Sequence, residues 1–114
     1  MKDCIFCRIV SHGTPAKVVY EDELALAFED LNPQAPVHVL VVPKRHIESV
    51  EHADSGDSAL LGHLVRTCAT VARKKGIVDM GYRVVTNTGP SAGQSVFHLH
   101  FHVLGGRRMT WPPG

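Results

Sequence analysis

Only one segment of this 114-residue chain has the apolar periodicity of an amphipathic helix, and this limits the folds that the chain can adopt. Its apolar residues recur every three or four positions: Leu60, Leu61, Leu64, Val65, Cys68, Val71 and Ala72. Possible N-caps precede it at Asp54, Ser55 and Asp57, and Gly76 follows its basic last turn. Parallel strands need a crossover of a dozen or more residues, usually a helix. With a single helix the sheet must be antiparallel, which predicts an α+β fold.

The segments with strand character are short and are separated by turn residues. They cover residues 18–20, 24–30, 37–42, 82–86 and 96–104. The run from Val37 to Val42 is almost wholly apolar and stops at Pro43, which is typical of a central strand covered on both faces. Short helical turns are expected near Cys4 and Ile47. The sequence predicts a five-stranded antiparallel sheet with one main helix and a short N-terminal helix, in a single domain over residues 1–114.

Charge and composition exclude several classes of protein. Twelve Lys and Arg balance eleven Asp and Glu, so no field of one sign favours nucleic acid or an anionic membrane. No stretch approaches the roughly 20 apolar residues of a membrane span, and residues 1–4 lack the apolar run of a signal peptide. Three cysteines, an odd number, fit a reducing compartment. We expect a cytoplasmic protein that binds neither nucleic acid nor membrane.

Three of the eight histidines alternate with apolar residues, at His98, His100 and His102. Alternate side chains of a strand share a face, so the three imidazoles are expected to line one open surface while the residues between them pack in a core. Three interpretations are open. The row is a solvated polar face, a mononuclear metal site, or the site of nucleophilic and acid–base chemistry on a phosphoryl group.

Spacing favours the phosphoryl chemistry. Along a strand His98 and His102 lie about 13 Å apart, so one ion with Zn–N bonds of about 2 Å reaches both only across a sharp bulge. Neighbouring histidines lie about 6.6 Å apart, which suits one ring attacking phosphorus while another meets the leaving group. In the preceding loop, Gly89 and Gly93 permit positive φ, so backbone N–H groups can form an anion nest to which Ser95 adds a hydroxyl.

These residues resemble the signature of the histidine-triad (HIT) superfamily. The resemblance rests on Asn87, Ala92, Gln94 and Val96 followed by His98 to Gly105, on residues 28–38 and 42–47, and on the ending Gly105-Gly106-Arg107 with Trp111-Pro112-Pro113-Gly114. The ending resembles that of the Hint branch, the histidine-triad nucleotide-binding proteins. The resemblance covers nearly the whole chain and implies the HIT-like fold, with sheets joined across a homodimer.

The resemblance implies a hydrolase that cleaves nucleoside 5′-phosphoramidates or aminoacyl adenylates to nucleoside monophosphate through a nucleotidyl-histidine intermediate. By similarity His100 is the nucleophile, and a neutral imidazole can attack phosphorus at pH 7. The His98 carbonyl would fix the tautomer of His100. Either His102 or Ser95 would protonate the leaving group, and His38 matches a fourth histidine near the active site. No organic cofactor is implied.

Similarity also assigns contacts to a purine nucleotide resembling AMP or GMP. Asp30 matches an acidic residue that grips the ribose hydroxyls, although an aspartate there fits a turn equally well. The apolar base pocket would consist of Ile5, Phe6, Ile9, Phe28 and Leu31, each of which alone fits a simple core. The phosphate loop would supply Asn87, Gly93, Gln94 and Ser95 beside His100 and His102.

The pair Cys4-x-x-Cys7 has three interpretations. Relatives that carry it bind zinc with two further histidines, which here match His46 and His98, as a closed site of structural type. A redox pair normally follows a strand in a βαβ unit, and no strand is expected before Cys4. Plain buried thiols are the third interpretation. If His98 holds zinc, its catalytic contribution is its backbone carbonyl alone.

Three functions therefore compete: a hydrolase, a nucleotide-dependent regulator or scaffold with incidental hydrolysis, and a metalloenzyme built on the histidine row. The intact row favours the hydrolase, because binding AMP needs no nucleophile. A homodimer is implied by the resemblance. It also fits the wide apolar stripe of the helix and the unpaired edge expected at residues 82–86, and it would let Trp111 reach the partner's site.

Overall fold

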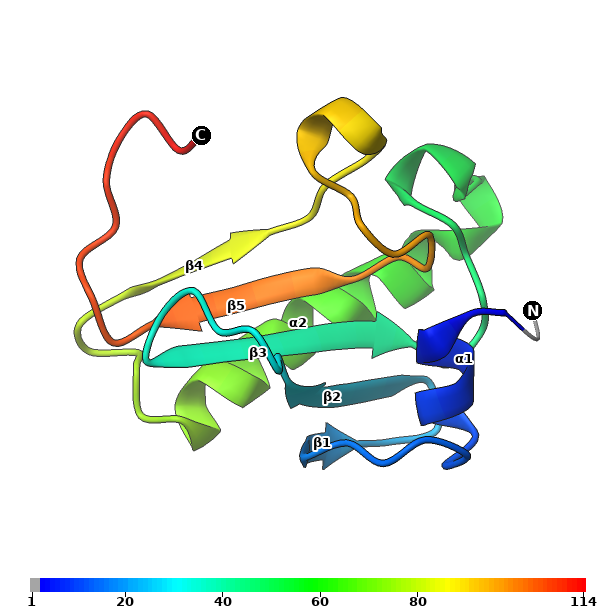
Figure 1. Ribbon diagram of the computed structural model, residues 1–114, viewed down its shortest axis with the longest axis horizontal. Helices are drawn as coiled ribbons and strands as arrows, with labels where there is room; N and C mark the ends of the chain where they lie inside the picture. The colour runs from blue at the N-terminus through cyan, green and yellow to red at the C-terminus, as the bar shows by residue number, and fades with distance from the viewer. Residues whose placement is uncertain (1–2) are drawn as a thin grey trace.

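The structure is a computed structural model that describes residues 3–114. Residues 1 and 2, part of the segment 1–4 that was compared with a signal peptide, lie outside this range. Figure 1 shows the order of elements: α1 (Ile5–Val10), β1 (Val18–Glu21), β2 (Ala25–Glu29), β3 (Val37–Pro43), α2 (Ser58–Lys74), β4 (Tyr82–Val85) and β5 (Phe101–Gly105). Three short 3₁₀ turns cover Val50–His52, Ser55–Asp57 and Pro90–Ala92.

One antiparallel sheet contains all five strands in the order β1-β2-β3-β5-β4. The apolar strand β3 lies at its centre, where Leu40 pairs with His102 of β5 and His38 pairs with Leu104. The helix α2 follows β3 in the chain and crosses one face of the sheet, whereas α1 lies at the opposite face (Figure 1). The predicted α+β fold, with a five-stranded antiparallel sheet, one main helix and a short N-terminal helix, is confirmed.

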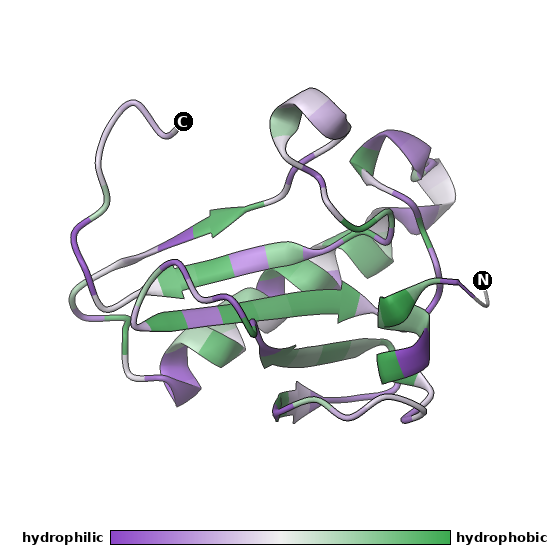
Figure 2. Ribbon diagram, in the orientation of Figure 1, coloured by the Kyte–Doolittle hydropathy of each residue, from purple (hydrophilic) through white to green (hydrophobic). Residues whose placement is uncertain are grey.

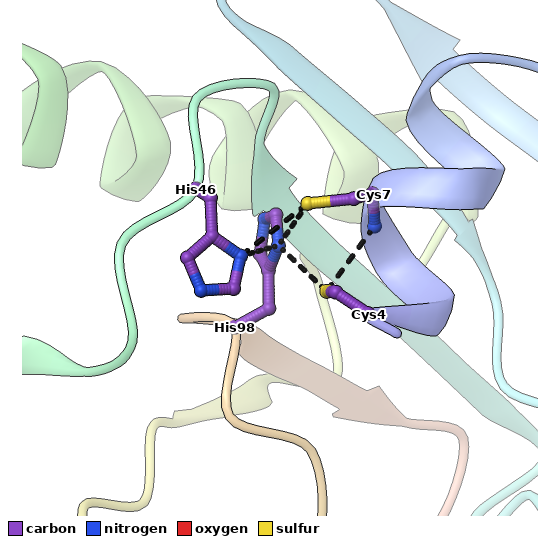
Figure 3. Close-up of side chains that lie close together, drawn as sticks. All are labelled: Cys4, Cys7, His46 and His98. Carbon is purple, nitrogen blue, oxygen red and sulfur yellow. Dashed lines mark hydrogen bonds between the residues drawn. The ribbon is translucent and has the colours of Figure 1, made fainter. Parts of the chain in front are cut away.

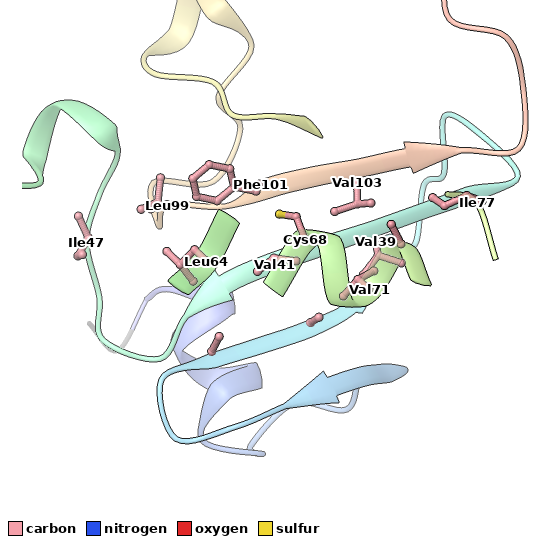
Figure 4. Packing of buried hydrophobic residues seen from close by; sticks show 13 residues of the cluster. Val39, Val41, Ile47, Leu64, Cys68, Val71, Ile77, Leu99, Phe101 and Val103 are labelled. Atoms are coloured by element: carbon pink, nitrogen blue, oxygen red, sulfur yellow. The ribbon is translucent and has the colours of Figure 1, made fainter. Parts of the chain in front are cut away.

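Alternation along the central strands builds a separate core on each face. On β3, Val39 and Val41 pack beneath α2 (Figure 4). Leu40 and Val42 point the other way and join a smaller core with α1. The ribbons of β2 and β3 are hydrophobic over most of their length (Figure 2), as burial on both faces requires. The α1-side core consists of Phe6, Ile9, Leu26, Phe28, Leu40 and Val42.

The apolar stripe of α2 is mostly covered within the chain. Leu64, Cys68 and Val71 are buried against the sheet. Val65 is 53% exposed, so the stripe extends beyond the part that the sheet covers. None of the helices in residues 3–114 has the length and apolar character needed to cross a membrane.

The last strand begins at Phe101, so the prediction of a strand from Val96 was wrong for residues 96–100. The ladder between β3 and β5 ends where Val41 pairs with Phe101, close to Pro43 at the end of β3. Proline has no N–H, so Pro43 cannot donate to a continued β5, although it still pairs with Ala25 of β2. The chain bends instead, and the Leu99 N–H donates to the Ile47 carbonyl at 2.6 Å.

The expected separation of the two sets of side chains still occurs. Leu99, Phe101 and Val103 all lie in the core beneath α2. The histidines, however, do not line an open surface. His98 is fully buried and His100 is 5% exposed, because α1 and its neighbouring core cover them.

Candidate active site and cysteine–histidine cluster

The His100 ring is held by the backbone two residues before it. Its Nδ1 lies 2.7 Å from the His98 carbonyl oxygen. A carbonyl can only accept, so Nδ1 carries the proton and Nε2 keeps its lone pair. Burial lowers the pKa of His100 below its usual value, which keeps the ring neutral at pH 7. The arrangement leaves one ring nitrogen free to act as a nucleophile.

A chain of hydrogen bonds fixes the protons of two more histidines. The Gln34 backbone N–H donates to His38 Nδ1 at 2.9 Å. His38 must then carry its proton on Nε2, which lies 2.9 Å from His102 Nδ1. His102 accepts this bond and has its own proton on Nε2 when neutral. Burial, reinforced by His100 and His38, lowers the pKa of His102 to about 4, so the neutral form prevails at pH 7.

Asp30 completes this cluster. Its Oδ2 lies 3.3 Å from His38 Nε2, and its Oδ1 accepts the Asn32 N–H at 2.8 Å. Ligand atoms of Asp30, His38 and His102 lie within 4.8 Å of one another, close enough to consider a metal ion. A metal on His38 Nε2 would move the proton to Nδ1, against the Gln34 N–H. The hydrogen-bonding pattern therefore favours a proton relay here and counts against a metal ion held by Asp30, His38 and His102.

A cavity of about 230 Å³ opens beside His100 and His102. Its walls are mainly apolar and come from α1, β2 and β3, while Asp30, Ser95 and the two histidines add polar groups. The complete lining is Ile5, Phe6, Ile9, Pro15, Ala16, Phe28, Glu29, Asp30, Leu31, Leu40, Ser95, Val96, His100 and His102. All five apolar residues expected around a base thus line one cavity together with Asp30.

The sequence did not predict some of the residues that line the cavity. Leu40 could have been found, because it lies two residues after His38 on β3 and so shares its face. Pro15 and Ala16 could not, since they reach the cavity only because α1 folds over the sheet. Glu29 lies at the end of β2, directly before Asp30.

Of the residues expected in the phosphate loop, only Ser95 lines the cavity. Asn87, Gly93 and Gln94 do not line the cavity. Gly89 and Gly93 do adopt positive φ, of 89° and 93°. Gln94 is buried, and its amide accepts the Gly89 N–H and donates to the carbonyls of Glu48 and Val96. In the structure its side chain supports the loop from within.

Cys4, Cys7, His46 and His98 form a second cluster at the N-terminal end of α1 (Figure 3). Their ligand atoms all lie within 4.8 Å of one another. Cys4 Sγ is 3.3 Å from His98 Nδ1, Cys7 Sγ is 3.3 Å from His46 Nδ1, and the two Nδ1 atoms are 3.1 Å apart. Atoms around a tetrahedral zinc lie about 3.3–3.8 Å apart, given Zn–N of about 2.0 Å and Zn–S of about 2.3 Å.

The protonation of His98 also fits a metal ligand. Its Nε2 donates to the Pro43 carbonyl at 2.8 Å, so the lone pair of the neutral ring is on Nδ1 and faces both thiols. A carbonyl bonded to the far nitrogen is the usual support of a metal-binding histidine. Two thiols and two imidazoles are a donor set that suits zinc. The residues present therefore fit that ion.

The remaining histidines lie elsewhere. His63 pairs with Asp22 at 2.7 Å between α2 and the β1–β2 turn. His12 and His52 are exposed and lie beside Glu21 and Glu48.

Comparison with known proteins agrees with this geometry. The HIT domain family matches residues 12–109. An uncharacterized HIT-like protein of Synechococcus elongatus is 52% identical over 113 residues, covering 99% of this chain and 98% of its own length. The crystal structure of a HIT family hydrolase from Legionella pneumophila superposes with a TM-score of 0.96 at 46% identity, covering 98% of this chain and all of that chain.

A HIT family hydrolase from Clostridium thermocellum superposes with a TM-score of 0.94 at 44% identity, with 96% of each chain covered. Sequence, fold and histidine arrangement agree, and the chain belongs to the histidine-triad (HIT) family.

Proposed function

We propose that the protein is a Hint-like hydrolase that cleaves nucleoside 5′-phosphoramidates or aminoacyl adenylates. The observation that carries this proposal is the His100 ring, neutral and with Nε2 unprotonated, in the wall of a cavity. Nε2 attacks phosphorus, and the bond from phosphorus to the amine or acyl oxygen breaks. Water then attacks the nucleotidyl-histidine, which releases nucleoside monophosphate and restores His100.

An amine leaves only when it takes up a proton, and His102 is better placed to supply it than Ser95. Both residues line the cavity. The hydrogen bonds from Gln34 to His38 and from His38 to His102 Nδ1 place the proton of His102 on Nε2, where it can be donated. A bound phosphate anion would raise the pKa of His102, because a nearby negative charge favours the cation. Protonation of His102 at Nδ1 would break its hydrogen bond from His38, and the cationic ring would then give its Nε2 proton to the leaving nitrogen.

The cavity suits a purine nucleotide. Its apolar walls, which include Phe6 and Phe28, match the faces of a planar base. The Asp30 carboxylate offers acceptor oxygens to ribose hydroxyls at the polar end.

Replacing His100 by Ala tests the nucleophile. We expect hydrolysis of adenosine 5′-phosphoramidate to fall by about 10³-fold or more, since the covalent step is lost. AMP affinity should change by less than about tenfold, because most of the wall remains. His52→Ala, an exposed histidine outside the cavity, is the matched control and should keep the wild-type rate.

The same substrate separates the competing functions. A nucleotidyl adduct on His100, seen by mass spectrometry with a slow substrate, would support the mechanism. An adduct on another residue contradicts it. Tight AMP binding with no measurable turnover would favour a nucleotide-dependent regulator instead.

Acid titration tests the relay. The pKa of His102 is lowered to about 4, so its ring should stay neutral as the pH falls through 6.5 and gain a proton only near pH 4. NMR of histidine-labelled protein would follow this, with His102→Gln assigning the resonance. A midpoint at or above 6.5 would show that the ring is not held neutral by burial.

We also propose that Cys4, Cys7, His46 and His98 hold a structural zinc ion. The ion would tie α1 to the sheet, and its thiolate ligands fit the cytoplasmic location that we propose. Elemental analysis of protein purified without added metal should give about one zinc per chain. Cys4→Ser with Cys7→Ser should lower the melting temperature, whereas zinc-free wild-type protein would leave the cluster as plain thiols.

A homodimer is the last part of the proposal. Strand β4 is at the sheet edge, and Val65 of α2 and Val84 of β4 are 53% and 38% exposed, so a second copy could cover both. Trp111 is 80% exposed, and the Arg83 guanidinium lies over its ring. The ring is not packed in the core of its own chain, so it could face the partner's site.

Sedimentation tests the dimer. It should give twice the 12.5 kDa chain mass. Val65→Glu should give monomer, while Leu24→Glu, at an equally exposed position on the β1–β2 turn, should not. A wild-type particle of 12.5 kDa at micromolar concentration would contradict the dimer.

A further inference from the structure

The helix α1 forms one wall of the cavity although it is too short to hold its place alone. It has six residues, and its backbone hydrogen bonds run to sequence neighbours between Cys4 and Thr14. An isolated helix of this length is not stable in water. Side chains fasten it to the sheet in two ways: the apolar contacts of Phe6 and Ile9, and the cluster of Cys4 and Cys7 with His46 and His98.

Phe6 belongs to the apolar contacts of α1 and also lies against the cysteine–histidine cluster. It lies between the two cysteines in the chain, is 6% exposed, and lines the cavity. Its ring meets the His100 ring edge to face, with centroids 5.2 Å apart at 89°. It meets His98 at 5.9 Å and Phe28 at 5.5 Å, again nearly perpendicular. One side chain thus touches a cluster ligand, the proposed nucleophile and the opposite apolar wall.

We propose that the Cys4-Cys7-His46-His98 cluster, when it holds zinc, positions Phe6 against His100 and thereby sets the affinity of the cavity for nucleotide. Phe6 is then a positioning residue, and the metal governs binding as well as stability. The inference deepens the proposed function and rests on it.

The two walls of the cavity differ in what fixes them. Phe28 and Leu40 belong to β2 and β3, whose backbones pair directly in the sheet. Their positions do not depend on the cluster. Ile5, Phe6 and Ile9 belong to α1, and without the cluster only their own apolar contacts hold them. Loss of the metal should therefore loosen one wall and leave the other in place.

The test measures AMP affinity by calorimetry in wild type and in Phe6→Leu, each with zinc loaded and with zinc removed by chelator. Stripping should weaken AMP binding about tenfold in wild type. Loaded Phe6→Leu should already bind about tenfold more weakly, and stripping it should cost less than about threefold more, because effects that act through one residue are not additive. Phe97→Leu, the same substitution at a half-exposed position outside the cavity, should behave as wild type.

Two further measurements separate positioning from simple stabilisation. Hydrogen exchange of residues 5–10 should speed up on stripping while that of β2 and β3 does not. His46→Gln removes a ligand that lies outside α1, and should weaken AMP binding as much as the chelator does. Circular dichroism at the assay temperature checks that each protein keeps its sheet.

Equal AMP affinity in loaded and stripped wild type would overturn this inference alone, and would leave the proposed hydrolase intact. Protein that takes up no zinc would overturn this inference together with the proposed zinc site, and would also leave the proposed hydrolase intact. Failure of loaded wild type to bind AMP would overturn the proposed function and this inference together.

Discussion

The hydrogen bond from His100 to the carbonyl of His98 is the contact on which the arrangement of the site depends. His98 can offer that carbonyl because its ring is anchored elsewhere: Nε2 donates to the Pro43 carbonyl, and Nδ1 faces Cys4 and Cys7. One residue therefore connects the end of the central strand, the thiol pair of α1 and the ring that lines the cavity. Displacing His98 would disturb all three at once.

Pro43 explains why His98 takes that position. Pro43 has no N–H to donate toward β5, so the ladder with β5 ends at Val41 and Phe101, although β3 still pairs with β2 as far as Pro43. In the segment before Phe101, Leu99 bonds to Ile47, and the His98 ring turns under α1, where it is fully buried.

The sequence predicted the parts of the structure that follow from local periodicity. Alternation correctly placed Phe101 and Val103 in the core beneath α2, and the single helical pattern correctly required an antiparallel sheet. Burial of His98 was not predictable in this way, because it depends on α1 folding over a segment more than 80 residues later. The hydrogen bonds through Gln34 and His38 could not be predicted either, since they depend on a backbone N–H in an irregular loop.

The hydrogen bonds of the buried Gln94 side chain affect how a ligand meets the protein. Its buried amide joins Gly89 and Val96 within one loop and Glu48 in another, so the chain leading into Ser95 is already ordered without a ligand. The conformational entropy of that loop is lost during folding rather than at the encounter. A ligand arriving beside Ser95 would meet a surface that is already formed, so its association would not wait for this loop to close.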